Sequence, residues 1–313
     1  MGSPLRGKMG APMALFYSDV FVLPLPTQHR FPMGKYARLR QRLLESDAFA
    51  EDEFRVPAEA SDVEITRAHC PAYLERVVAG ALDAKEQRAI GFPWSERMVR
   101  RSRQSSGATL AAAREALTRG WAANLAGGTH HAFRDRGEGF CVFNDAAITA
   151  RAMQAEAGLQ RIAIVDCDVH QGNGTASIFR GDDAVFTFSI HGARNFPFAK
   201  EASDLDIDLA DGTGDDEYLW HLERGLDETL ERSRPQLVIY LAGADPYEDD
   251  RLGRLKLTKR GLARRDRHVL GTLHARGVPV AIAMAGGYAR NIEDSVAIHA
   301  NTLCTAREIW PDS

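Results

Sequence analysis

The sequence predicts a single α/β domain built on a mostly parallel sheet with helices on both faces. Two observations carry this prediction. Short apolar runs alternate with helical patterns through the middle and C-terminal parts of the chain, and no linker rich in Pro, Gly or Ser divides its 313 residues. Strands that are apolar throughout and separated by helices are typical of a parallel sheet covered on both faces. We expect one domain over residues 1–313, with residues 1–12 as a flexible tail.

The elements are expected in the following order. The first 90 residues look more helical and less regular, apart from a strand within Ala14–Phe21. A helix over Ser95–Arg119 precedes the sheet, and helices over Asp215–Arg232 and Thr258–Arg276 show apolar residues at three- and four-residue steps. Five short apolar runs are expected as its strands: Ala122–Leu125, Arg161–Val165, Ala184–Ile190, Leu237–Leu241 and Val278–Ala283.

The composition is that of a globular protein, with 44% hydrophobic and 26% charged residues. A net charge of −4 argues against a nucleic-acid binder, which usually concentrates Lys and Arg. The four cysteines form no CxxC pair, and no apolar run is long enough to span a membrane, so we expect a reducing, cytoplasmic location. Two arginine clusters in helical stretches are expected on solvated faces: Arg97, Arg100, Arg101 and Arg103, and Arg264, Arg265 and Arg267.

Polar or glycine-rich segments follow each of the expected strands. The carboxyl ends of parallel strands lie along one edge of a sheet, where ligands bind. One such segment means little because loops are polar, but the coincidence of all of them predicts a site at this edge. Paired glycines at two of these ends also indicate close approach of the backbone. The segments are Gly127–His131, Asp166–His170, His191, Gly243–Asp245 and Gly286–Tyr288.

Asp166, Asp168 and His170 alternate in the sequence, so an extended backbone would place their side chains on one side. Two close carboxylates repel each other unless a cation or hydrogen-bond donors lie between them. We expect Asp168 and His170 to bind a metal with Asp245 as a third ligand, because three protein ligands and an open position are typical of catalytic zinc. A capped, hydrogen-bonded loop is the alternative interpretation of the same pattern.

The doublet His130–His131 follows a strand and a glycine pair, which favours a role at the same edge over an accidental pairing. Adjacent histidines on an extended backbone point in different directions, so each needs its own partner. Asp166 is free of the expected metal set and could orient one of the two imidazoles.

Taken together, these motifs resemble the histone deacetylase family, which includes acetylpolyamine amidohydrolases and acetoin-utilisation proteins. The resemblance extends from about Leu15 to about Thr302 and is closest to the smaller class IV-like and bacterial members. Its specific motifs are Gly-Gly-Thr-His-His-Ala at 127–132, Gly-Phe-Cys-Val-Phe-Asn-Asp at 139–145, Asp-Cys-Asp-Val-His-Gln-Gly-Asn-Gly-Thr at 166–175, Gly-Ala-Asp at 243–245 and Gly-Gly-Tyr at 286–288.

The resemblance implies an arginase/deacetylase fold with a sheet of about eight strands, and a zinc-dependent hydrolase of acetyl- or longer acyl-lysine. It implies that His131 is the general base, that His130 paired with Asp166 tunes the site, and that Tyr288 donates a hydrogen bond to the substrate oxygen. The remaining implied residues are the Zn²⁺ ligands Asp168, His170 and Asp245; the tunnel residues Gly139, Phe140, Phe196 and Leu252; and the K⁺ site Asp166, Asp168, His170, Ser189 and Ile190. Asn173 stands where some members have an Asp beside the second histidine.

Three other functions remain open at this point. A deacylase of small acylated amines such as polyamines is the nearest, although the inserted loop that usually narrows its entrance has no obvious counterpart here. An arginase-like binuclear enzyme needs further carboxylates, whereas Gln171 and Gly172 follow His170. A non-catalytic acyl-lysine binder is the third, and it is disfavoured because every expected catalytic position holds a competent residue. Preferred acyl chain and oligomeric state do not follow from the sequence, and no nucleic-acid or membrane partner is expected.

Overall fold

The computed structural model describes residues 13–26 and 28–311, so the expectation of a tail at residues 1–12 lies outside the described residues. An eight-stranded sheet with the order β2-β1-β3-β8-β7-β4-β5-β6 runs through the centre, and every neighbouring pair is parallel. The strands are β1 (Leu15–Phe16), β2 (Phe54–Arg55), β3 (Trp121–Asn124), β4 (Ile162–Asp166), β5 (Val185–Gly192), β6 (Leu205–Leu209), β7 (Leu237–Leu241) and β8 (Val280–Ala283). The predicted α/β fold with a parallel sheet is confirmed.

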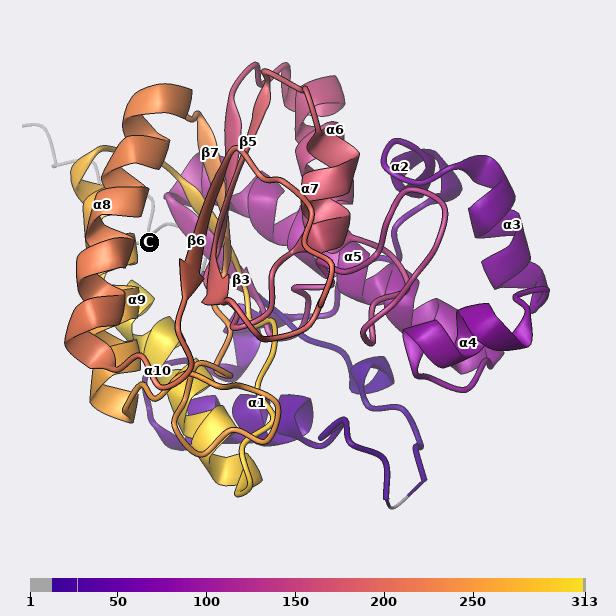
Figure 1. Ribbon diagram of the computed structural model, residues 1–313, viewed down its shortest axis with the longest axis horizontal. Helices are drawn as coiled ribbons and strands as arrows, with labels where there is room; N and C mark the ends of the chain where they lie inside the picture. The colour runs from indigo at the N-terminus through magenta and orange to yellow at the C-terminus, as the bar shows by residue number, and fades with distance from the viewer. Residues whose placement is uncertain (1–12, 27, 312–313) are drawn as a thin grey trace, which may run out of the picture.

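Helices cover both faces of the sheet (Figure 1). The long α5 lies across β1, β3 and β8 and packs on α6, whereas α8, α9, α10 and α1 form a continuous layer on the other face. The helices are α1 (Lys35–Glu45), α2 (Asp62–Thr66), α3 (Pro71–Ala79), α4 (Ala84–Ile90), α5 (Glu96–Arg119), α6 (Asp145–Ala157), α7 (Asn173–Phe179), α8 (Asp215–Ser233), α9 (Lys259–Ala275) and α10 (Ile292–Ile309). No helix among the described residues combines the length and apolar character needed to cross a bilayer.

The central strands form because their side chains have apolar surroundings on both faces. All residues of β3, β4, β7 and β8 are buried. Burying one large aliphatic side chain contributes about 1.5–3 kcal/mol, so these strands are the core of the fold.

The expected strand in Ala14–Phe21 is shorter than predicted. It ends at Phe16, and Ser18 accepts a hydrogen bond from Val20 N to start a 3-10 turn over Asp19–Phe21.

The expectation of two solvated arginine clusters is wrong for one member of each. Arg101 is 3% exposed, and its guanidinium donates to Phe21 O and the Tyr36 hydroxyl. Arg265 is fully buried and pairs with Asp266. Each points inward from its helix because it meets buried hydrogen-bond acceptors there, which burial of a guanidinium requires.

Candidate active site and metal centre

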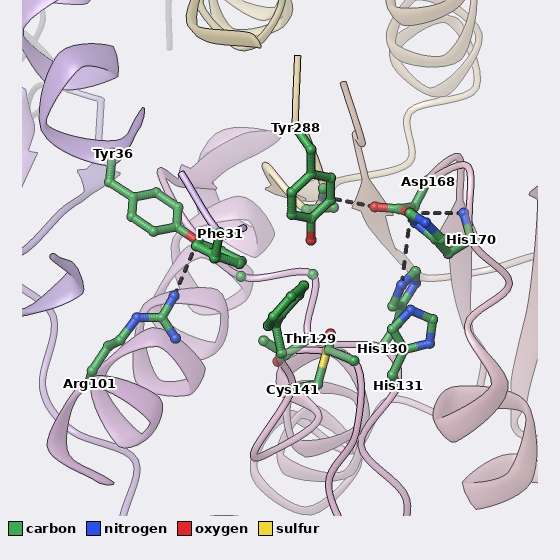
Figure 2. Close-up of a pocket in the computed structure, with 16 residues that line it drawn as sticks. Phe31, Tyr36, Arg101, Thr129, His130, His131, Cys141, Asp168, His170 and Tyr288 are labelled. Carbon is green, nitrogen blue, oxygen red and sulfur yellow. Dashed lines mark hydrogen bonds and ion pairs between the residues drawn. The ribbon is translucent and has the colours of Figure 1, made fainter. Parts of the chain in front are cut away.

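The carboxyl ends of the central strands bring the predicted residues together at one edge of the sheet. Asp166 ends β4, and the segment Asp168–His170 follows it, while Asp245 follows the neighbouring β7. Figure 2 shows His130, His131, Asp168, His170 and Tyr288 around one cavity. The arrangement predicted from the strand ends is therefore observed, except that His191 does not line this cavity and its Nε2 lies 2.9 Å from Asp208 Oδ1.

The segment after β4 bends and does not continue as the extended backbone that we expected for Asp166, Asp168 and His170, so the hydrogen-bonded loop that we gave as the alternative is present. Asp166 Oδ1 accepts a hydrogen bond from Asp168 N, and Asp168 Oδ1 accepts one from His170 N. Such bonds from an aspartate to the backbone two residues on are typical of Asx turns. They direct Asp166 towards His130 and leave Asp168 and His170 facing Asp245.

Asp168, His170 and Asp245 are buried, and each offers a ligand atom within 4.8 Å of the other two. His170 Nδ1 lies 2.9 Å from Asp168 Oδ1 and 3.2 Å from Asp245 Oδ2. Although the latter pair is close, Asp245 Oδ2 makes no hydrogen bond of acceptable geometry. A buried carboxylate oxygen without a donor is costly, and a cation satisfies it. The donor set thus fits one metal ion.

Electrostatics support the same conclusion. Burial and the adjacent charge of Asp168 raise the pKa of the Asp245 carboxyl to about 7. Burial alone would lower the pKa of His170, but the adjacent carboxylates of Asp168 and Asp245 raise it to about 10. Both shifts favour the protonated forms of this cluster, so binding of a divalent cation would release protons from it.

Two glycines make this crowding possible. A Cβ atom at Gly286 would collide with the carboxylates of Asp245 and Asp168, and one at Gly128 would collide with Ala285. Gly128 also has a φ of +69°. The close backbone approach that the paired glycines predicted is present at both strand ends.

The two histidines of the doublet have different partners and opposite pKa shifts. His130 Nδ1 lies 2.6 Å from Asp166 Oδ2, and His131 Nδ1 lies 2.7 Å from Asn173 Oδ1. Burial disfavours the charged form of His130, yet the charges of Asp166 and Asp168 raise its pKa to about 9. Burial, together with the charge of His130, lowers the pKa of His131 well below its usual range. At neutral pH His130 is an imidazolium, whereas His131 is a neutral base.

Tyr288, which follows β8, faces the cluster of Asp168, His170 and Asp245. Its ring centroid lies 6.3 Å from that of His170, and its hydroxyl points into the cavity (Figure 2). Asp250 fixes its backbone by accepting a hydrogen bond from Tyr288 N at 2.6 Å. Burial and the charges of Asp168 and Asp245 raise the pKa of Tyr288 well above its usual value. The hydroxyl therefore keeps its proton and can donate it in a hydrogen bond.

A cavity of about 700 Å³ leads to this cluster and is lined by all four residues that we expected along a substrate tunnel: Gly139, Phe140, Phe196 and Leu252. The ring centroids of Phe196 and His131 are 4.9 Å apart. A second cavity of about 30 Å³ lies behind it, with Arg101, Tyr36 and Cys141 in its wall. Residues His131, Gly139, Phe140, His170 and Tyr288 line both cavities.

Two residues around the site were missed by the sequence analysis. Glu138 Oε1 accepts a hydrogen bond from Asn173 Nδ2 at 2.6 Å, so Asn173 bridges His131 and a carboxylate. The buried Arg265 donates to Gly243 O at 2.5 Å and Cys167 O at 3.3 Å, which ties together the two segments that carry Asp245 and Asp168. The sequence offers one signal for Glu138, its place beside the Gly139 motif, and none for Arg265, which stands among solvated arginines.

Comparison with known proteins identifies the family in which these motifs occur. Residues 29–303 match the family model of the histone deacetylase domain. An uncharacterized protein of Picosynechococcus is 45% identical over 96% of this chain and all of its own length. Histone deacetylase 2 of Arabidopsis thaliana is 31% identical over 91% of this chain and 78% of its own length. A histone deacetylase-like amidohydrolase of Pseudomonas aeruginosa is 33% identical over 70% of this chain and 62% of its own length.

Solved structures agree on the fold. A histone deacetylase homologue from Aquifex aeolicus has a TM-score of 0.80 and 22% identity, covering 96% of this chain and 88% of its own. An acetylpolyamine aminohydrolase from Burkholderia pseudomallei has a TM-score of 0.78 and 23% identity, covering 95% and 99%. At this identity the two likenesses establish the arrangement of the strands and helices.

Proposed function

The chain belongs to the histone deacetylase family of hydrolytic deacetylases, and from this premise we propose that it is a zinc-dependent amidohydrolase of acyl-lysine. It would remove acetyl or longer acyl groups from the side-chain amine. One observation carries the proposal. A buried cluster of Asp168, His170 and Asp245 lies at the end of an apolar-walled cavity, with a neutral imidazole and a tyrosine hydroxyl beside it.

Asp168, His170 and Asp245 would hold one zinc ion per chain. When bound, the ion would polarise the amide carbonyl and make a water molecule acidic near neutral pH. Two oxygens and one nitrogen also suit ferrous iron, so the choice of zinc over iron is part of what we propose.

A structural K⁺ is proposed at Asp166, Asp168, His170, Ser189 and Ile190. Ser189 lies opposite Asp166 in the sheet, and its hydroxyl is also 2.9 Å from His191 Nδ1.

His131 would act as the general base. Its Nδ1 donates to Asn173 Oδ1, which leaves Nε2 unprotonated and able to accept a proton from the attacking water. The imidazole ring of His131, now protonated, would then donate this proton to the leaving amine. His130 is already protonated by its pairing with Asp166, so it would contribute charge rather than accept a proton.

Tyr288 would stabilise the oxyanion. Its hydroxyl would donate a hydrogen bond to the substrate oxygen, which gains negative charge as the carbonyl carbon becomes tetrahedral. The bond from Tyr288 N to Asp250 orients this side chain before the substrate arrives. Phe140 and Phe196 would enclose the methylene groups of the lysine.

We expect metal-dependent release of acetate or a longer acid from acyl-lysine peptides, measured on a panel from acetyl to myristoyl after removal of metal and reloading with defined ions. Acetylputrescine, assayed in parallel, tests the alternative that the enzyme acts on small acylated amines. Higher turnover of acetylputrescine would overturn the lysine assignment. A metal-to-chain ratio near two would instead favour the binuclear alternative.

Glu138 is expected to orient the Asn173 amide. A carboxylate accepts only, so it draws Asn173 Nδ2 towards itself and turns Oδ1 towards His131. In Glu138→Gln the new amide can donate or accept, and this constraint is lost. We expect kcat to fall about tenfold with little change in KM. Side-chain ¹⁵N NMR of His131 should show loss of the single Nδ1–H tautomer, and a variant with unaltered kcat and tautomer would contradict this role.

A further inference from the structure

The mouth of the 700 Å³ cavity is lined by charge of one sign. Its inner end contains His131, His170 and Tyr288, so a substrate must pass through it to reach the metal cluster. Four arginines line the outer part, and no Asp, Glu or Lys does so among residues 13–26 and 28–311. They come from three separate segments: Arg30, Arg194, Arg251 and Arg254.

Most of this charge is not neutralised by the protein. The guanidinium of Arg30 is exposed and makes no hydrogen bond or ion pair within the described chain. Arg251 donates to two backbone oxygens, Tyr288 O and Arg30 O, and to no carboxylate. Arg194 and Arg254 share one carboxylate, that of Asp211. Its Oδ2 lies 3.6 Å from Arg194 Nη1 and 3.2 Å from Arg254 Nη1. Four positive charges therefore face one negative charge, and a cleft with such walls concentrates anions.

The position of these arginines identifies which part of the substrate they meet. Arg251 holds the carbonyl of Tyr288, and Asn195 beside Arg194 donates to Leu252 O, so the charged rim is built directly onto the tunnel walls. The methylene groups of an acyl-lysine would fill the space between Phe140 and Phe196. Phe198, which is 86% exposed, extends this apolar wall outward. The arginines would then surround the groups attached beyond the lysine Cα.

We propose that the substrate carries a carboxylate close to its acylated lysine, and that this cationic rim, defined as Arg30, Arg194, Arg251 and Arg254, selects it. The inference rests on the proposed amidohydrolase function. The same charges repel lysine- and arginine-rich peptides and acylated polyamines, whose free amines would have to lie in the rim. The recognised carboxylate can belong to a flanking Asp or Glu, or it can be the α-carboxylate of the acyl-lysine itself.

The test uses matched acetyl-lysine peptides with one Asp, Ala or Lys on either side of the reactive residue, assayed with the zinc-loaded full chain. We expect kcat/KM to be about tenfold higher for the Asp peptide than for the Lys peptide at low salt, with most of the difference in KM and a smaller ratio at high salt. Acetyl-lysine with a free or an amidated α-carboxyl group, blocked at its α-amine, distinguishes the two sources of the carboxylate.

Arg30→Gln combined with Arg194→Gln should remove most of the preference and leave kcat for the Ala peptide close to wild type. Both side chains are exposed, so folding is not expected to depend on them. The matched control is Arg264→Gln on α9, which removes an exposed arginine that pairs with Asp216 of α8 and should keep the preference. Equal turnover of all peptides, or faster turnover of the Lys peptide, overturns the inference. Absence of turnover with every acyl-lysine substrate would instead overturn the proposed function.

Discussion

Asp245→Asn is expected to abolish stoichiometric zinc binding and, with it, detectable deacylation. Asparagine keeps the shape of the side chain and can still accept the hydrogen bond from Val169 N that Asp245 Oδ1 accepts at 2.9 Å. It removes the charge and the unpartnered Oδ2 that we assign to the metal. With two protein ligands left, the cation loses both coordination and charge compensation. Metal analysis after dialysis and a zinc titration against a chromogenic chelator measure the loss.

Thermal unfolding of the metal-free proteins separates this effect from misfolding. At pH 8, above the pKa of about 7 given to Asp245 by burial and by Asp168, its ionised carboxylate is repelled by Asp168. The asparagine variant lacks this repulsion, so its Tm should equal or exceed that of metal-free wild type. Asp249→Asn removes a surface carboxylate from the same loop and should bind zinc normally. Full zinc occupancy in Asp245→Asn would refute the ligand assignment.

Tyr288→Phe is expected to reduce kcat about 10²- to 10³-fold, because it removes a single hydrogen bond that strengthens as the oxyanion forms. The ring would remain between His170 and Phe140, so zinc content and substrate KM should change little. The measurement is steady-state kinetics on an acetyl-lysine peptide together with metal analysis.

Tyr247→Phe supplies the control, since it deletes a hydroxyl from a half-buried tyrosine outside both cavities. It should retain wild-type kinetics. Loss of zinc in Tyr288→Phe would mean that the tyrosine supports the metal site rather than the reaction. Wild-type kcat in the same variant would exclude it as the oxyanion donor.

The central part of the fold could be predicted because its strands are buried on both faces. Leu237–Leu241 was predicted with its observed bounds, and α5 and α8 differ by one residue at one end. The edge strands β2 and β6 carry a weaker signal. Phe54–Arg55 has two residues, and Leu205–Leu209 alternates leucine or isoleucine with aspartate. An edge strand is held partly by its neighbour, so its own sequence need not be uniformly apolar.

The site could be predicted where its residues follow strands, because topology alone brings strand ends together. The contacts of Glu138, Arg101 and Arg265 depend instead on side-chain direction, which sequence spacing does not determine. Arg101 and Arg265 sit in charged helical stretches that are otherwise exposed, and only tertiary packing shows which arginine of each cluster turns inward. The rim arginines come from three loops whose proximity no periodic pattern reveals.

The three residues that we propose as zinc ligands follow β4 and β7, two strands that are adjacent in the sheet but distant in the chain, and Arg265 links their loops by donating to Gly243 O and Cys167 O. The side chains come together only when the two strands are paired, so we do not expect the proposed ion to nucleate folding as it does in a zinc finger. We therefore expect the proposed zinc ion to bind after folding, and chelation should leave a folded protein that binds zinc again when the ion is returned.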